Sequence, residues 1–449
     1  MSDNPLKDNP FRTTSMQFLG EQHSGYFRRS LTALAAAGGQ TPTAEKLARL
    51  AAQPASRQAI EALLAENTVP GDLGASLRRT RLWLMLTLIE RDLGGQAELQ
   101  EICSAMTAFA EIATQHALRA AAAELRERHG RALDRDGQPQ DLLAVGMGKA
   151  GGDELNVSSD LDLVFVFRGE GETEGVDGKG VLASSEWMHR LARRAIELLA
   201  EYTADGFVFR VDTRLRPNGD SGPLVVSLNM LEQYFYAQGR EWERFAWLKG
   251  RVIGDSGVAG DAARRGDEAA LARVVTPFVY RRYMDYAAFT ALRDLHALIR
   301  AEVGRRAARD PDALDVKLGR GGIREIEFFA QTQQLIAGGR DPALRVRPTG
   351  EALAALAQTG WITPRAASEL TEAYWFLRAV ENRLQMLRDE QTHTMPEDDQ
   401  GLAVIAALMG EESLESFVDR YRATLARVQH HYAELFADMV RHFGEGLEF

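Results

Sequence analysis

The run SSDLDLVFVF (158–167) constrains the fold of this chain more than any other, because it places two aspartates at the edge of an apolar segment. A short apolar run of this kind is typical of a buried strand. Residues two apart on a strand point to the same face, so Asp160 and Asp162 would aim their carboxylates at one spot. Two carboxylates that close repel each other unless a cation lies between them. The run therefore predicts a buried strand with a metal site at its start.

Helical sequence precedes this strand. Segments 82–94 and 105–129 carry apolar residues at three- and four-residue spacing, the pattern of amphipathic or buried helices. The polar loop 134–140 contains Gly and Pro and marks a boundary. A chain of 449 residues is long enough for two or three domains. We predict an N-terminal helical region (1–135), a compact core (136–258) and a C-terminal helical bundle (259–449).

The sequence pattern of the core is that of a small α/β unit. Strands are predicted at 141–148, 161–167 and 206–217, and an amphipathic helix at 184–202. Helical texture returns after residue 255, most clearly in 323–336 and 374–387. The predicted fold class is α+β and mostly helical, with a small mixed β-sheet flanked by helical regions.

The glycine-rich segment GMGKAG (146–151) admits two familiar interpretations that its context opposes. The dinucleotide fingerprint G-x-G-x-x-G needs a helix directly after the glycines, and the connector before the next strand is too short for one. A phosphate-binding P-loop needs Gly where Leu143 stands and Ser or Thr where Ala150 stands. We therefore expect a glycine turn that joins two strands and lets backbone N–H groups approach a phosphate.

A third carboxylate, Asp212, lies on the predicted third strand. Three carboxylates on adjacent strands can hold two divalent ions, and hard oxygen ligands favour Mg²⁺, or Mn²⁺, over zinc. Paired ions and nearby cations suit an in-line phosphoryl displacement, and Lys149, Arg214 and Arg216 are candidates for the cations. Two bland alternatives stay open. The D-x-D pair could mark only a strand end, and the two arginines could pair with the aspartates as a structural network.

Several long motifs resemble one known family. The spacing from Gly148 to the D-x-D pair is similar to that of the nucleotidyltransferase superfamily of the DNA polymerase β type. More narrowly, five segments resemble the bifunctional glutamine synthetase adenylyltransferase/adenylyl-removing enzymes; they are 146–167, 207–224, 238–255, 317–331 and 374–396. QGREWERFAW and GGIREIEF resemble the N-terminal, adenylyl-removing half of that family. The chain is too short for both halves, so we expect it to be that half, a fragment of a longer protein.

The resemblance implies a role for each site residue, with residues 136–258 as the nucleotidyltransferase catalytic core. Asp160, Asp162 and Asp212 would be catalytic and bind the metals, and Asp212 would also steer the attacking phosphate. Nucleotide and phosphate binding would fall to seven residues: Gly148, Lys149, Gly151, Gly152, Ser159, Arg214 and Arg216. Lys149 departs from the broad superfamily, in which Gly or Ser usually follows the first glycine, but it agrees with the narrower family.

The resemblance also implies the reaction and the partners. The adenylyl-removing half removes AMP from a tyrosine of adenylylated glutamine synthetase by phosphorolysis. It is regulated by the uridylylated form of the PII signalling protein. Three alternatives stay open: addition of AMP from ATP to glutamine synthetase, a regulatory module that only binds PII and glutamine synthetase, and a nucleotidyltransferase for a small molecule. The long helical flanks suit a protein substrate better than a small molecule.

Two polar clusters that follow the predicted strands admit two interpretations each. Residues 240–243 (Arg-Glu-Trp-Glu) could contact the substrate or simply form a helix with charges at i,i+4 spacing. Arg320, Arg324, Glu325 and Glu327 surround a predicted helix start, which suits an anion. We favour the structural interpretation there, in which Glu325 and Glu327 complement the helix dipole.

Composition sets the remaining expectations. A formal net charge of −11 argues against a broad nucleic-acid footprint, and Cys103, as the only cysteine, excludes an intramolecular disulfide. The polar N-terminus lacks the apolar core of a signal peptide, and no stretch is long and apolar enough to cross a bilayer. We expect a cytoplasmic enzyme with neither a nucleic-acid nor a membrane partner.

Overall fold

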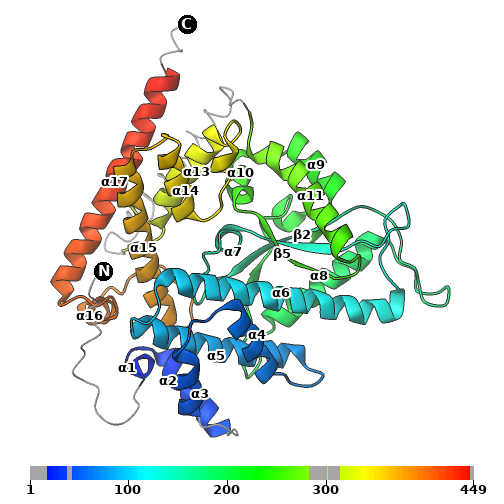
Figure 1. The fold of residues 1–449 in the computed structure, drawn as a ribbon, viewed down its shortest axis with the longest axis horizontal. Coiled ribbons are helices and arrows are strands. Elements are labelled where there is room, and N and C mark those ends of the chain that lie inside the picture. The colour runs from blue at the N-terminus through cyan, green and yellow to red at the C-terminus, as the bar shows by residue number, and fades with distance from the viewer. Residues whose placement is uncertain (1–17, 38–42, 283–300, 302–313, 445–449) are drawn as a thin grey trace.

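The computed structural model describes residues 18–37, 43–282, 301 and 314–444. A small sheet lies among helices, as the sequence predicts, so the fold class of a mostly helical α+β protein is confirmed. Figure 1 shows α6 running along the sheet, with α4 and α5 beyond it and the C-terminal helices gathered at one end. None of the described helices is long and apolar enough to cross a membrane.

The helices and strands have the following bounds. Before the sheet come α1 Leu19–His23, α2 Gly25–Ala37, α3 Thr43–Ala51, α4 Arg57–Glu66, α5 Leu73–Leu93 and α6 Leu99–His129. The central elements are β1 Leu142–Gly146, α7 Gly148–Gly151, β2 Leu161–Phe167, α8 Ser184–Ala200, β3 Val211–Asp212, β4 Val225–Ser227, α9 Leu228–Ala237, α10 Glu241–Leu248 and β5 Arg251–Asp255. The helices that follow are α11 Asp261–Val279, α13 Ile323–Ala337, α14 Thr349–Gln358, α15 Pro364–Met386, α16 Asp399–Leu408 and α17 Leu414–Gly444.

The sheet is mixed, as predicted. Within the described residues it has five strands in the order β3-β2-β1-β5, with β4 also paired to β2. β1 runs antiparallel to β2 and β5, whereas β3 and β4 run parallel to β2. The apolar run of β2 is buried on both faces because helices cover the sheet, which explains why it lacks strand alternation. This central strand carries Asp162 near its first residue.

The predicted third strand, 206–217, is wrong in length. Only Val211 and Asp212 pair with β2. The backbone N–H groups of Val208 and Phe209 instead donate to the carbonyl of Leu199 at the end of α8, so they are not available to a ladder. Two strands, β4 and β5, were not predicted because each is short and lies beside polar or glycine residues.

The helical regions are anchored to the sheet by packing. α6 contacts α8 and β5, and one buried cluster contains apolar side chains from all three predicted regions, from Phe27 through Leu163 to Tyr374. Cys103 on α6 belongs to that cluster and is a free thiol. The three-way division of the chain into domains stays a prediction.

Candidate active site

Asp162 and Asp212 are direct partners in the parallel pairing of β2 and β3. Paired residues on neighbouring strands lie about 5 Å apart and point to the same face of the sheet. The structure therefore brings together two carboxylates that are fifty residues apart in sequence, as the sequence predicts (162 and 212).

Asp162 lies in a protein environment that disfavours its charge. Burial raises its pKa to about 6, and the charges of Asp212 and, more weakly, Asp160 act in the same direction. The charge of Lys317 opposes them. Gly148 has a φ of +51° and lies so close that a Cβ there would be 3.4 Å from Asp162 Oδ2. The glycine turn and the carboxylate pair thus form one site.

Asp160 is held by a residue that the sequence did not single out. Arg210 Nε donates to Asp160 Oδ1 at 2.5 Å, and its Nη2 donates to the Ser158 carbonyl at 2.5 Å. Arg210 therefore anchors the turn before β2 and occupies one carboxylate oxygen of the D-x-D pair. The available signal was its position within the predicted third strand (206–217), two residues before Asp212.

Asp212 has a cationic partner of its own. Arg214 Nε lies 2.9 Å from Asp212 Oδ2, and the Arg214 backbone N–H donates to Oδ1 at 2.8 Å. The hydrogen bonds from Arg214 hold the pKa of Asp212 below its usual value, although burial opposes them. Because the Arg214 side chain is 72% exposed, this guanidinium can turn toward a ligand at little cost.

Asp162 and Asp212 are candidate ligands for a divalent cation. These two carboxylates supply adjacent hard oxygen atoms. The positive charges near Asp162 do not offset its burial and the neighbouring carboxylates, so the site suits a cation such as Mg²⁺ or Mn²⁺. In the part of the chain that the structure describes, no three His, Cys, Asp or Glu side chains are arranged as a ready metal cage. Asp160 is committed to Arg210, so its metal-binding role would require that ion pair to open. The two predicted ions stay a prediction.

The glycine turn after β1 is built by close packing. A Cβ at Gly151 would lie 1.9 Å from the Lys249 carbonyl oxygen, and one at Gly152 would lie 2.9 Å from Glu154 Oε2. The fold therefore requires Gly151, because its clash is with backbone, whereas the close contact at Gly152 is with the end of a side chain. Ser159 accepts a hydrogen bond from the Asn156 backbone at 2.9 Å, which shapes the connector that leads to the aspartates. Phosphate contacts by these three residues stay a prediction.

The Lys149 side chain forms an ion pair inside the protein. Its ammonium lies 2.8 and 2.6 Å from the two carboxylate oxygens of Glu381 on α15. Burial lowers the pKa of Lys149 to about 8, although Glu381 opposes this. Burial would raise the pKa of Glu381, but Lys149, Arg378 and Lys317 together lower it to about 2. Both partners are thus charged at neutral pH.

The polar face of α15 is a feature that sequence reasoning missed. Asn156 Nδ2 donates to Glu381 at 2.8 Å, and the backbone N–H groups of Val157 and Ser158 donate to Asn382 and Gln385. These side chains grip the connector just before the aspartates. The available signal was a stripe of Arg, Glu, Asn and Gln at 378, 381, 382 and 385, spaced three and four residues apart on one face of α15.

The other predicted polar residues have structural partners. Arg216 Nη1 donates to the carbonyl and hydroxyl of Thr213, so this guanidinium supports the loop after β3. Glu243 accepts from the Arg240 backbone at 2.8 Å and caps α10. Glu325 accepts from the Gly321 backbone at 2.9 Å, while Glu327 pairs with Lys249 at 3.2 Å. These contacts agree with the structural interpretation of both clusters.

A glycine turn between two strands, followed by aspartates on two paired strands of a small mixed sheet, is the arrangement expected of a nucleotidyltransferase. The chain belongs to the glutamate-ammonia ligase adenylyltransferase family, whose family model matches residues 24–265. The family model of the GlnD PII-uridylyltransferase matches residues 293–436. The resemblance stated from the motifs is thereby confirmed.

Similar proteins carry the name bifunctional glutamine synthetase adenylyltransferase/adenylyl-removing enzyme. The one from Burkholderia pseudomallei is 47% identical over 434 residues, which cover 95% of this chain and 46% of that protein. The one from Ralstonia nicotianae is 48% identical over 379 residues, covering 82% and 39%. The one from Thioalkalivibrio sulfidiphilus is 46% identical over 361 residues, covering 80% and 36%. The chain thus spans about half the length, or less, of the curated relatives it matches.

Proposed function

We propose that this chain is the adenylyl-removing half of such an enzyme and that it cleaves AMP from a tyrosine of adenylylated glutamine synthetase by phosphorolysis. The observation that carries the proposal is the register of β2 and β3, which sets Asp162 beside Asp212 next to the glycine turn. The name of the relatives indicates glutamine synthetase as the target. The motifs QGREWERFAW and GGIREIEF favour removal of AMP over its addition.

The chemistry requires control of negative charge. An oxygen of inorganic phosphate forms a bond to the phosphorus of the AMP group, the bond from that phosphorus to the tyrosine oxygen breaks, and the phenolate takes up a proton to give ADP and unmodified tyrosine. Both reactants are anionic, so positioning and electrostatic stabilisation supply most of the acceleration. Asp162 and Asp212 would hold Mg²⁺, which would supply positive charge to the reacting phosphate groups.

The chain's own residues would orient the reactants. Gly148 leaves room for a phosphate beside Asp162, because any side chain there would contact the carboxylate. Arg214 is exposed and flexible enough to bind a phosphate oxygen in place of Asp212. Lys149 adds a positive charge to the turn while Glu381 fixes its position.

The proposal includes partners that the relatives' name does not fully specify. Adenylylated glutamine synthetase would be the substrate, and uridylylated PII would regulate the reaction. A cytoplasmic location, ATP binding by the whole protein, and a role in nitrogen metabolism belong to the same proposal. The match to the PII-uridylyltransferase family model supports a link to nitrogen signalling.

The decisive experiment supplies AMP-modified glutamine synthetase, phosphate and Mg²⁺, and measures ADP. We expect ADP with the native chain, a loss of about a thousandfold or more with Asp212→Asn, and full activity with the matched surface variant Asp261→Asn, whose side chain is 79% exposed. A parallel reaction with ATP and unmodified glutamine synthetase tests the alternative of AMP addition. If the reaction with ATP incorporates AMP and the reaction with phosphate releases no ADP, the chain adds AMP rather than removing it. Binding without either reaction would favour the regulatory module.

A further inference from the structure

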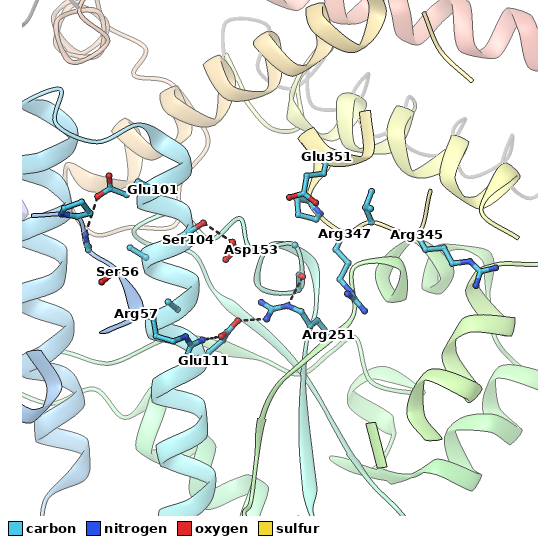
Figure 2. Close-up of a pocket in the computed structure, with 18 residues that line it drawn as sticks. Ser56, Arg57, Glu101, Ser104, Glu111, Asp153, Arg251, Arg345, Arg347 and Glu351 are labelled. Carbon is cyan, nitrogen blue, oxygen red and sulfur yellow. Dashed lines mark hydrogen bonds and ion pairs between the residues drawn. The ribbon is translucent and has the colours of Figure 1, made fainter. Parts of the chain in front are cut away.

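A cavity of about 700 Å³ lies apart from the carboxylate pair. It is lined by the start of α4, by one face of α6, by residues 151–153 after the glycine turn, by Arg251, and by the segment 345–348 with Glu351. Three distant parts of the chain thus enclose it (Figure 2). Its volume lies within the range of small-molecule sites.

Two guanidinium groups face this cavity together. Arg251 and Arg347 both line the cavity. In Figure 2 the guanidinium of Arg251 is directed toward Glu111, Arg347 extends from the segment 345–348, and Arg345 points away from both. Arg251 Nη1 pairs with Glu111 at 2.5 Å, but Glu111 also pairs with Arg57, so one carboxylate serves two cations. Arg347 donates to the Gly250 carbonyl at 3.1 Å and has no carboxylate partner among the described residues.

The charges of the two arginines repel each other, whereas Glu111 and Asp153 partly compensate the charge of Arg251. Burial lowers the pKa of Arg347, and the positive charge of Arg251 lowers it further. Burial also lowers the pKa of Arg251. Arg347 is exposed and Arg251 is partly buried. An oxyanion between the two cations would relieve their repulsion, and the fork of a guanidinium fits a phosphate.

The acidic side chains of the cavity define the rest of the ligand. Glu101 is occupied by Arg91 at 2.8 Å. Asp153 accepts a hydrogen bond from Ser104 at 2.9 Å and keeps further acceptor positions, and Glu351 also lines the wall. Carboxylates in the wall of such a cavity can accept hydrogen bonds from sugar hydroxyl groups.

We infer that this cavity binds a phosphorylated sugar or nucleotide, with its phosphate between Arg251 and Arg347 and its hydroxyl groups against Asp153 and Glu351. Arg251 also donates to the carbonyls of Ala150 (3.1 Å) and Gly151 (3.3 Å). A ligand that binds Arg251 therefore acts on the turn that carries Lys149. The cavity shares Gly151 and Gly152 with the glycine turn, but neither Asp162 nor Asp212 lines it, so binding there can be tested apart from the proposed function.

The test is calorimetric titration of the full chain with ribose 5-phosphate in EDTA, which keeps divalent ions from the carboxylate pair. We expect Arg347→Gln to weaken binding about tenfold, while Asp162→Asn and Arg365→Gln leave it unchanged. Arg365 is the matched control because its side chain is 83% exposed on α15. Loss of binding in Asp162→Asn, equal binding in Arg347→Gln, or no binding by the native chain would each overturn the inference.

A second variant separates ligand contact from damage to the fold. Asp153 has a φ of +59°, which Asn also tolerates, so Asp153→Asn should leave the backbone unchanged. We expect this variant to weaken ribose 5-phosphate about threefold or more and to leave inorganic phosphate binding unaltered. Equal weakening of both ligands would contradict a hydroxyl contact and overturn the ligand class.

Discussion

The ammonium of Lys149 lies 2.6 Å from Glu381 Oε2, although 232 residues separate the two in sequence. Glu381 is 2% exposed, and it also accepts from Asn156 and pairs with Arg378 at 3.3 Å. A helix beyond the sheet therefore holds both the glycine turn and the connector to the aspartates. The site is formed by the core together with α15.

Loss of the Glu381 charge should destabilise the fold. Glu381→Gln leaves the buried charges of Lys149 and Arg378 without their carboxylate, and removal of one buried partner costs about 3 kcal/mol or more in the free energy of unfolding. Urea unfolding measures this cost. The matched control is Glu186→Gln, which breaks an exposed pair with Arg190 and should cost less than about 0.5 kcal/mol. Equal stabilities of the two variants would show that the α15 contact contributes little.

The low pKa of Glu381 also predicts an acid dependence. A carboxylate whose pKa falls from 4.5 to about 2 on folding stabilises the folded state above its unfolded pKa, and this contribution disappears as the pH falls from about 4.5 toward 2. The difference in the free energy of unfolding between the native chain and Glu381→Gln should therefore shrink across that interval. A difference that stays constant from pH 6 to pH 3 would contradict the shifted pKa.

Asp162 predicts the opposite dependence on pH. Its pKa is raised from 3.8 to about 6, so the folded state holds the proton more tightly than the unfolded state, and stability is lost as the pH rises through this range. In EDTA at pH 8, Asp162→Asn should be more stable than the native chain by roughly 1–3 kcal/mol, and the gain should vanish near pH 4. Thermal unfolding measures both.

The same thermal unfolding, repeated with Mg²⁺ in place of EDTA, tests for a metal at the two carboxylates. A cation that neutralises Asp162 and Asp212 should raise the unfolding temperature of the native chain at pH 8 and leave Asp162→Asn unchanged. Asp261→Asn should respond like the native chain, because its carboxylate is on the surface. An identical Mg²⁺ response in Asp162→Asn would place the ion elsewhere.

Lys317 should tune the same carboxylate. Its charge lowers the pKa of Asp162 and acts on Lys149 and Glu381, although the residue belongs to the segment before α13. Lys317→Gln should therefore raise the pKa of Asp162, so that the acid limb of ADP formation moves to higher pH. Lys179→Gln, in the exposed loop before α8, should leave the pH profile unmoved. If the pH profile of ADP formation is unchanged in Lys317→Gln, the charge of Lys317 does not act on the site.

Sequence patterns predicted the parts of the site whose cause is local. The apolar run 161–167 gave β2 at its observed bounds, and the D-x-D spacing placed Asp162 at its start. The partners of those residues depend on contacts between distant segments. Arg210 reaches Asp160 only because Leu161 N–H bonds to the Arg210 carbonyl, and Glu381 reaches Lys149 only because α15 docks on the connector. No short window of sequence contains either relationship.

Gly151 separates a structural role from a phosphate-binding one. A Cβ at this position would lie 1.9 Å from the carbonyl oxygen of Lys249 and 2.7 Å from that of Gly146, and both are backbone atoms that cannot rotate away. Gly151→Ala should therefore cost about 3 kcal/mol or more in the free energy of unfolding, measured in urea without phosphate or metal. Gly266→Ala on α11 is the control, since a Cβ there meets open space and Ala should stabilise a helix by about 0.5–1 kcal/mol. If Gly151→Ala keeps full stability and loses only phosphate-dependent activity, the turn needs this glycine for its ligand. If stability falls as expected, the glycine is explained by the packing of the turn against the backbone of Lys249 and Gly146.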